Sequence, residues 1–439
     1  MTSPSGDRAV AILCHYFPPL NSSGAKRMEA LSAYFAEWGE EVVVISTTKS
    51  GTVADLSETP PPGVTLLEVD PLGRLRPSRA SSAVSASSPA SAVGQTTGQK
   101  LKAFVMRLLG QLPDPRLSFA LAMASPFLAA EVKEVLRRSR VAIGTAPPWP
   151  VLLAAVIAKR RFRVPVVLDY RDNFSNCHEM PGGKFAKRLE LTVDRFLARR
   201  ADLVVTISDP MTDYYGRMSS GTVTVMNGFD ARRMTAARAA APYVADREGP
   251  AIVRYLGVVT PGRIPHALLA ALEELVAEGV ASSRDVQFEF YGDALVLQEH
   301  LAGRPNDLRD MFRFLAPVPY DVALQKIVTA DWLLFVEHAV PPRPGEEASA
   351  AGILPTKMFE YASSGRPILA DVAANTLMGG FIRAAGDMHV VGNDPASFRR
   401  ALTSPMFARP PECAVSEAVQ AASREHQSRK YLDVISRFR

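Results

Sequence analysis

The sequence is poor in the features that mark secreted, disulfide-bonded and membrane-spanning proteins. It has three cysteines, and their spacing matches neither a metal site nor a disulfide framework. No apolar run reaches the roughly 18 residues of a membrane-spanning helix. The longest run, residues 117–130, is interrupted by Ser125 and Pro126, and residues 1–8 show no signal-peptide pattern. These absences predict a cytoplasmic protein, with the inner face of the plasma membrane as an alternative location.

Charge is distributed unevenly along the chain. Residues 1–229 hold 27 Lys and Arg against 20 Asp and Glu, a net charge of +7, whereas residues 230–439 hold 23 against 25, a net charge of −2. A basic half can face anionic lipid as a peripheral membrane protein or bind an anionic molecule, although solubility explains it equally well. Residues 100–112 are predicted to form a basic amphipathic helix, which fits either a membrane surface or packing on its own sheet. The dispersed basic residues and the lack of a reading motif argue against a nucleic-acid partner.

The chain repeats one α/β pattern. A length of 439 residues suggests about two domains. Residues 9–14 form an apolar run typical of a buried parallel strand, followed by a small-residue loop with Gly24 and a helix over 26–38. The same order returns at residue 251, where a strand precedes the glycine-bearing loop 257–263. The pattern predicts two doubly wound, Rossmann-like α/β domains.

The domain boundaries follow from turn signals and composition. We expect the first domain over residues 1–229, the second over 230–420, and a C-terminal helix over 421–439 that packs back on the first. Residues 231–249 are predicted to be a linker. Residues 80–99 carry no charge and are rich in Ser, Ala, Thr and Gly, which predicts a mobile or disordered loop.

The stretch from residue 352 to residue 370 contains the strongest candidate binding site. Thr356 is a plausible N-cap for a short helix that Gly365 ends. The free N–H groups at the helix start, together with Lys357, predict an anion site that suits phosphate. Glu360 lies one turn further on, where a carboxylate better suits neutral hydroxyls such as those of a ribose. The same helix start and stop signals are common in α/β folds without any ligand, so the prediction depends on the rest of the chain.

The order and spacing of several segments resemble the large retaining branch of the GT-B glycosyltransferases (group 1, or family 4, type). The resemblance covers residues 9 to about 435, and its last segment matches a subgroup with a Pro-[Ser/Thr]-Lys-x-x-Glu-Tyr box. The matching segments are residues 16–27, 169–172, 227–230, 255–263, 314–319 and 355–367. The resemblance implies a GT-B fold, in which two facing Rossmann-like domains flank an interdomain cleft, with the acceptor bound by the first domain and a nucleotide sugar by the second.

The resemblance also implies a function and its chemistry. We expect a glycosyltransferase of the hexosyltransferase type that moves a sugar from a nucleotide diphosphate sugar to the hydroxyl of a small or lipid-linked acceptor, in cell-surface polysaccharide or glycosylated-metabolite biosynthesis. Transfer builds negative charge on the leaving phosphate, which needs fixed positive partners. The sequence has no Asp-x-Asp box for a divalent metal. We therefore expect no metal and no cofactor besides the donor, with a retaining mechanism in which the donor's own phosphate accepts the acceptor proton.

The residues that match the family's motifs define the expected sites. Arg263 and Lys357 should hold the diphosphate, and Glu360 should bind the ribose. The donor-binding residues are expected to be Gly24, Gly257, Arg263, Pro319, Thr356, Lys357 and Glu360. The acceptor-binding residues are expected to be His15, Arg27, Arg171 and Asp172. We expect catalytic roles for Arg263, Lys357 and Asp172.

One position departs from the family's pattern. The family often carries two glutamates separated by seven residues, and Gly352 stands where the first would precede Glu360. Glu337, Glu346 and Glu347 are candidate replacements for the lost carboxylate. Two alternatives therefore stay open: an isomerase similar to the sugar-nucleotide 2-epimerases, and a catalytically silent partner that binds a nucleotide sugar.

Overall fold

The structure is a computed structural model of the chain, and it divides into two compact units. It describes residues 9–20, 22–47, 59–75, 114, 116–180, 182–245, 248–337 and 341–438. The predicted mobile loop over 80–99 and the predicted basic helix over 100–112 lie outside the described residues. Each unit is described by itself below.

The two units are not continuous in sequence. The first comprises residues 1–226, 341–353 and 427–439, and the second comprises 227–340 and 354–426. The sequence analysis placed 341–353 in the second domain, but helix α13 (Glu347–Gly352) packs on α7 (Asp209–Gly216) of the first unit. Contiguous boundaries read from composition cannot reveal a segment that crosses to the other unit and returns.

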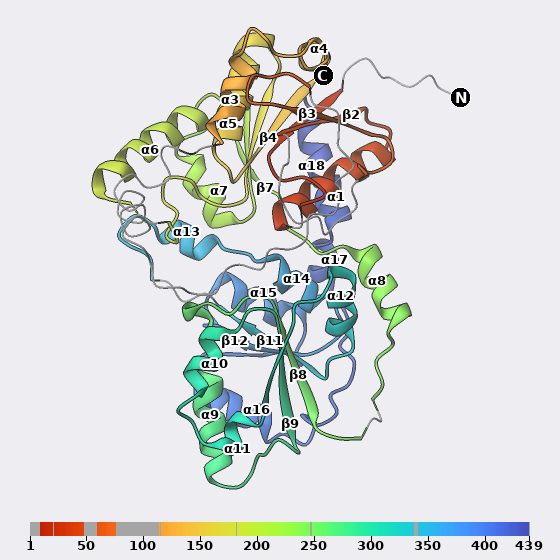
Figure 1. The fold of residues 1–439 in the computed structure, drawn as a ribbon, viewed down its shortest axis with the longest axis vertical. Helices are drawn as coiled ribbons and strands as arrows, with labels where there is room; N and C mark the ends of the chain where they lie inside the picture. Colours follow the sequence, from red (N-terminus) through yellow and green to blue (C-terminus); the bar gives the residue numbers. More distant parts are fainter. Residues whose placement is uncertain are drawn as a thin grey trace. The chain divides into compact units, whose positions relative to one another are not determined.

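A seven-stranded parallel sheet forms the centre of the first unit, in the order β3-β2-β1-β4-β5-β6-β7 (Figure 1). Its strands are β1 (Val10–Cys14), β2 (Val42–Thr47), β3 (Val64–Val69), β4 (Val141–Ala146), β5 (Val166–Tyr170), β6 (Leu203–Thr206) and β7 (Thr222–Thr224). Apolar and β-branched residues fill the central strands because helices cover both faces. Successive residues of β1 alternate between two core clusters, with Leu13 in one and Ile12 in the other.

Helices of the first unit cover these two clusters. They are α1 (Ser23–Glu37), α3 (Leu117–Ala124), α4 (Ala130–Arg138), α5 (Pro150–Phe162), α6 (Lys184–Ala198), α7, α13 and the part of α18 (Arg424–Ile435) from Gln427 onward. Residues of α3, α4 and α5 pack into the cluster that contains Leu13. Phe35 of α1 and Tyr431 of α18 pack into the other, with ring centroids 6.1 Å apart. The last helix therefore belongs to the core of the first unit.

The second unit is built on a six-stranded parallel sheet in the order β10-β9-β8-β11-β12-β13 (Figure 1). Its strands are β8 (Ala251–Leu256), β9 (Val286–Tyr291), β10 (Phe312–Leu315), β11 (Trp332–Val336), β12 (Ile368–Asp371) and β13 (Val390–Gly392). Its helices are α8 (Ala231–Ala240), α9 (His266–Ala277), α10 (Leu295–Leu301), α11 (Asn306–Arg309), α12 (Tyr320–Val328), α14 (Thr356–Ala362), α15 (Leu377–Ala385), α16 (Pro395–Leu402) and α17 (Glu417–Ala421).

The predicted linker over 231–249 is wrong in its first half. Residues 231–240 form α8, whose N-cap Asp230 accepts a hydrogen bond from the backbone N–H of Arg233 at 3.0 Å. The helix packs on α12. An alanine-rich, weakly amphipathic stretch favours a helix once a neighbouring helix covers it, and sequence alone does not reveal that neighbour.

Both sheets have the doubly wound topology, which confirms the predicted α/β fold class. The strand order reverses between β1 and β4 in the first unit and between β8 and β11 in the second. Ligands of such sheets bind at the carboxyl ends of the strands beside this reversal. No helix in the described part of the chain is long and apolar enough to cross a membrane.

Candidate functional site

In the second unit, Lys357 lies at the carboxyl end of β8. Its ammonium is 3.9 Å from the centroid of the Tyr255 ring. Gly257, which follows β8, has a φ of +128°, a conformation that residues with side chains rarely adopt. A Cβ atom at this position would lie 3.5 Å from Lys357 Nζ. The glycine turns the chain and leaves open space beside the ammonium.

The electrostatics around Lys357 favour an anionic ligand. The pKa of Lys357 is lowered to about 7, first by burial and then by the charge of Arg263, while Glu360 opposes the shift. Arg263 ends the short 3-10 helix Pro261–Arg263 that follows Gly257. Two neighbouring cations repel each other when one is buried, and an anion beside both relieves that repulsion.

Glu360 is held by a tyrosine that the sequence analysis did not single out. The Tyr320 hydroxyl donates to Glu360 Oε1 at 2.7 Å, and both residues are buried. Burial, and then the charge of Glu360, raise the pKa of Tyr320, so the phenol remains a proton donor at neutral pH. None of the described residues donates to the second oxygen, Glu360 Oε2. That oxygen can therefore accept a hydrogen bond from a ligand hydroxyl.

Two other predicted donor residues flank helix starts. Thr356 is the first residue of α14, Pro355 occupies the N-cap position, and no side chain caps the helix. The prediction of Thr356 as the N-cap is therefore wrong, because the extended Pro355 already ends the loop. Pro319 holds the same N-cap position before α12, next to Tyr320.

Two carboxylates end neighbouring strands of the same sheet. Glu337 follows β11 and Asp371 ends β12. Burial raises the pKa of Asp371 to about 6, and the charge of Glu337 adds to the shift. Burial also raises the pKa of Glu337. The sequence analysis did not identify Asp371 as a candidate site residue. The one signal for it in the sequence is that an acidic residue directly follows an apolar run.

Packing explains why a glutamate is absent at position 352. Gly352 ends α13 in the first unit, and a Cβ atom there would lie 2.8 Å from both Met211 Cγ and Ser208 Oγ. A glutamate would not fit without moving these neighbours. Glu346 and Glu347 also lie in the first unit, so Glu337 is the one candidate replacement in the unit that holds Lys357.

In the first unit, Arg27 is engaged by the protein itself. Its Nη2 lies 2.9 Å from Asp169 Oδ1 and donates to the Val225 carbonyl at 3.0 Å, and its Nη1 donates to the Met226 carbonyl at 2.7 Å. Asp169 is fully buried and also accepts from the Thr145 hydroxyl at 2.8 Å. The structure therefore gives Arg27 a role in holding α1 on the sheet, and its expected part in acceptor binding stays a prediction.

Gly24 makes room for Arg171. The prediction that Gly24 lies in a loop is wrong, because the Ser22 side chain caps α1 and the glycine falls in its first turn. A Cβ atom on Gly24 would lie 1.8 Å from Arg171 Nη1. The guanidinium also donates to the Thr145 hydroxyl at 3.2 Å and to the Pro147 carbonyl. Burial lowers the pKa of Arg171, although Asp172 and Asp169 oppose the shift.

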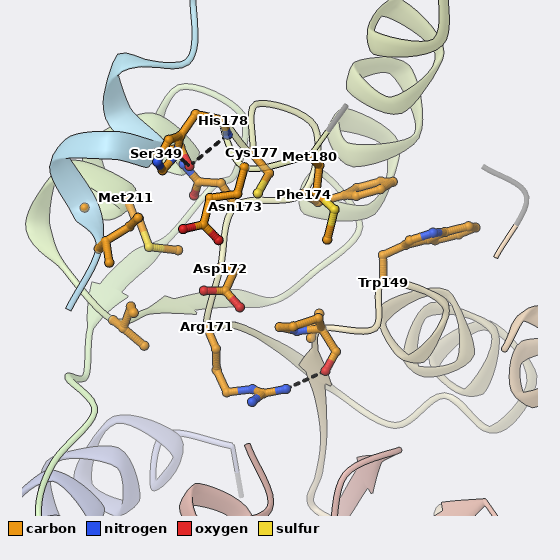
Figure 2. Close-up of a pocket in the computed structure, with 16 residues that line it drawn as sticks. Trp149, Arg171, Asp172, Asn173, Phe174, Cys177, His178, Met180, Met211 and Ser349 are labelled. Atoms are coloured by element: carbon orange, nitrogen blue, oxygen red, sulfur yellow. Dashed lines mark hydrogen bonds between the residues drawn. The ribbon is translucent and has the colours of Figure 1, made fainter. Parts of the chain in front are cut away.

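Asp172 lines a cavity of about 120 Å³ in the first unit (Figure 2). Asn173 beside it is 5% exposed, and neither atom of its amide group has a hydrogen-bond partner in the described structure. The stacked rings of Trp149 and Phe174, 5.3 Å apart, line the same cavity. The Asp172 carboxylate is open to the cavity, but the surrounding protein raises its pKa and Arg171 opposes that shift. The arrangement suits a ligand with hydroxyl groups.

His15 follows β1 and is held in place by its neighbours. Its Nδ1 lies 2.8 Å from the Thr47 hydroxyl, and its ring packs edge-on against Tyr16, with centroids 4.9 Å apart. The structure thus places His15 at the carboxyl edge of the first sheet, while Asp172 and Arg171 follow β5 at the same edge.

Comparisons with known proteins agree with this architecture. Residues 24–228 match the family model described as a glycosyl transferase 4-like domain. Sucrose-phosphate synthase from Thermosynechococcus elongatus has a similar fold, with a TM-score of 0.61, 15% sequence identity and coverage of 98% of each chain. TarM has a TM-score of 0.61 at 9% identity, over 99% of this chain and 100% of its own. WaaG, a glycosyltransferase involved in lipopolysaccharide biosynthesis, has a TM-score of 0.52 at 14% identity, over 97% of this chain and 99% of its own. No curated protein sequence matches the chain.

The chain has the GT-B fold, and its first unit carries a glycosyl transferase 4-like domain. The predicted GT-B fold is thereby confirmed.

Proposed function

We propose that the second unit binds the diphosphate of a nucleotide sugar through Lys357 and Arg263. The half-buried Lys357 ammonium, which lies 3.9 Å from the centroid of the Tyr255 ring and has its pKa lowered to about 7 with a second cation beside it, is the observation that carries this proposal. In an unliganded protein this arrangement is unfavourable, and the diphosphate would stabilise it. The same two charges would stabilise the leaving phosphate as the glycosidic bond breaks, which is why we assign the reaction no metal.

Glu360 would bind the ribose of the donor. Its Oε1 is already occupied by the Tyr320 hydroxyl at 2.7 Å, which fixes the carboxylate and leaves Oε2 for a ribose hydroxyl. Tyr320 is thus a positioning residue for Glu360. Gly257 would let the phosphates approach the backbone after β8, and Pro319 would edge the base.

The acceptor would bind in the Asp172 cavity. The Asp172 carboxylate would accept a hydrogen bond from a sugar hydroxyl, and the unpartnered amide of Asn173 would be a second polar group nearby. The rings of Trp149 and Phe174 would form an apolar wall. Arg171, whose guanidinium fits beside Gly24 because the glycine has no side chain, would orient Asp172. These groups support an acceptor that is a glycan precursor or a hydroxylated metabolite.

We assign the transfer a retaining course. No nucleophile of the protein is required, since the donor phosphate can take the proton of the acceptor hydroxyl as the new bond forms on the same face. Lys357 and Arg263 would then stabilise the diphosphate that leaves.

A thermal-shift screen against UDP, GDP, dTDP, ADP and their sugars tests the donor site. We expect one diphosphate to raise the melting temperature of the wild type and to have no effect on Lys357→Met or Arg263→Ala. The matched control is Lys133→Met, which removes a lysine of the first unit outside both candidate sites. An equal shift in the wild type and in both donor-site variants would refute the assignment.

A further inference from the structure

A second cavity of the first unit lies beside α6 and is strongly cationic. Its volume is about 880 Å³. Seven of its lining residues are cationic: Lys184, Lys187, Arg188, Arg195, Arg199, Arg217 and Arg343. Glu346 is the acidic residue of the lining, and its Oε2 accepts a hydrogen bond from the backbone N–H of Arg343 at 3.1 Å.

The protein neutralises few of these charges. The two acids of α6, Glu190 and Asp194, are fully buried and face the interior. Glu190 pairs with Lys187 at 3.2 Å, and Asp194 accepts from Ser175 and two tyrosines. Among the residues that the structure describes, Arg188, Arg195 and Arg217 form no ion pair. Cations gathered around one cavity without counter-charges repel one another and favour an anionic guest.

One of the residues that line the cavity carries a buried amide without a partner. Asn176 is 6% exposed and lines the cavity, yet neither its Oδ1 nor its Nδ2 has a hydrogen-bond partner in the described structure. A buried polar group without a partner costs free energy, which a bound ligand would recover. The Nδ2 group can donate to a ligand oxygen, as the neighbouring guanidinium groups can.

We propose that this cavity binds a ligand that carries clustered phosphate groups, at a site separate from the donor site of the second unit. Guanidinium groups match the oxygens of phosphate and bind them in pairs, and their number here suits more than one phosphate. The proposal does not depend on the assignment of Lys357 and Arg263.

Two sources could present such phosphates, a free compound or a lipid headgroup. Along α6, Phe185, Leu189 and Phe196 recur at helical spacing and are 80%, 45% and 42% exposed. No acid is exposed on α6 between them. An apolar stripe beside a cationic one is the pattern of a helix that lies at an anionic lipid surface. The vesicle experiment below distinguishes a lipid headgroup from a free compound.

Titration calorimetry with inorganic tripolyphosphate tests the site on the full chain. The Arg188→Ser/Arg195→Ser variant removes two exposed charges and should weaken this binding about 30-fold. The control Arg309→Ser/Arg313→Ser removes the same charge from exposed positions of the second unit and should bind as the wild type does. Measurement in the Lys357→Met background excludes binding at the donor site.

The substitution Asn176→Asp gives an independent check. It keeps the size of the side chain and adds a negative charge at the lining of the cavity, so this single variant should bind tripolyphosphate more weakly than the wild type does. Equal weakening in the α6 variant and the Arg309/Arg313 control would show attraction to net charge alone and overturn the proposal, as would the absence of binding to both tripolyphosphate and the vesicles described below.

Sedimentation with phosphatidylcholine vesicles, with and without phosphatidic acid, identifies the source. Binding that needs phosphatidic acid and is lost in Phe185→Ser/Phe196→Ser supports a lipid headgroup. Binding of tripolyphosphate without sedimentation supports a free compound. The control Val280→Ser/Leu295→Ser removes exposed apolar residues of the second unit, 54% and 61% exposed, and should sediment as the wild type does.

Discussion

The Lys357 ammonium should make donor binding depend on pH in a calculable way. Its pKa of about 7 in the unliganded protein results first from burial and then from the charge of Arg263. A diphosphate beside the ammonium favours its charged form and raises the pKa. Between these two pKa values, binding of the donor takes up a proton, so the affinity must fall as pH rises.

The magnitude follows from the fraction of charged lysine. With a pKa of about 7, about half of the unliganded molecules carry the charge at pH 7 and about one in a hundred at pH 9. The affinity should therefore fall about 50-fold over this range. The intact nucleotide sugar is the suitable ligand, because both of its phosphates are esterified and neither titrates in this range.

Isothermal titration calorimetry at a series of pH values measures this dependence. Lys357→Arg should bind with an affinity that does not change over the range, since arginine stays charged, and Lys357→Met should bind weakly at every pH. A wild-type affinity that is constant from pH 7 to pH 9 would refute the reasoning about burial. Equal affinity of the wild type and Lys357→Met would remove the lysine from the donor site altogether.

Three further predictions concern stability and positioning. Lys357 binds its proton less tightly in the folded than in the unfolded protein, so Lys357→Met should raise the free energy of unfolding at pH 7, and with it the melting temperature. The gain should be at most about 4 kcal/mol, less because the side chain is partly exposed, and it should vanish above pH 10.5. Arg27→Met leaves the fully buried Asp169 without its ion partner, so urea unfolding should show a loss of about 3 kcal/mol that Arg27→Met/Asp169→Asn partly restores. Gly24→Ala displaces the buried guanidinium of Arg171 from its hydrogen bonds to Thr145 and Pro147, so the acceptor KM should rise; an unchanged KM would contradict the role of the glycine.

The sequence predicted the sheets better than the sites. Short apolar runs such as residues 10–14 and 251–256 were recognisable as strands because they are too short for buried helices and are followed by loop residues. Their alternation with helices along the chain predicted a doubly wound topology. The helix α8 was missed because its stability depends on α12, a neighbour that no local pattern reveals.

The candidate site shows the same limit for side chains. Lys357 and Glu360 were accessible to prediction because both lie in one short motif. The partner of Glu360, Tyr320, lies 40 residues earlier, and nothing in the sequence links the two. Arg27 was predicted as an acceptor-binding residue from the family resemblance of residues 16–27. Its ion partner Asp169 lies 142 residues away, and nothing in the sequence links the two.

The interleaving of the two units in sequence has a consequence for biosynthesis. Tyr431, Leu432 and Ile435 belong to the hydrophobic core of the first unit, and the Gln427 side chain accepts a hydrogen bond from the backbone N–H of Met226. A ribosome delivers residues 1–226 long before it delivers these. Until the second unit has been synthesised, α1 alone covers this part of the sheet and the surface that α18 later buries stays open. A nascent chain in this state exposes apolar surface that a chaperone can recognise.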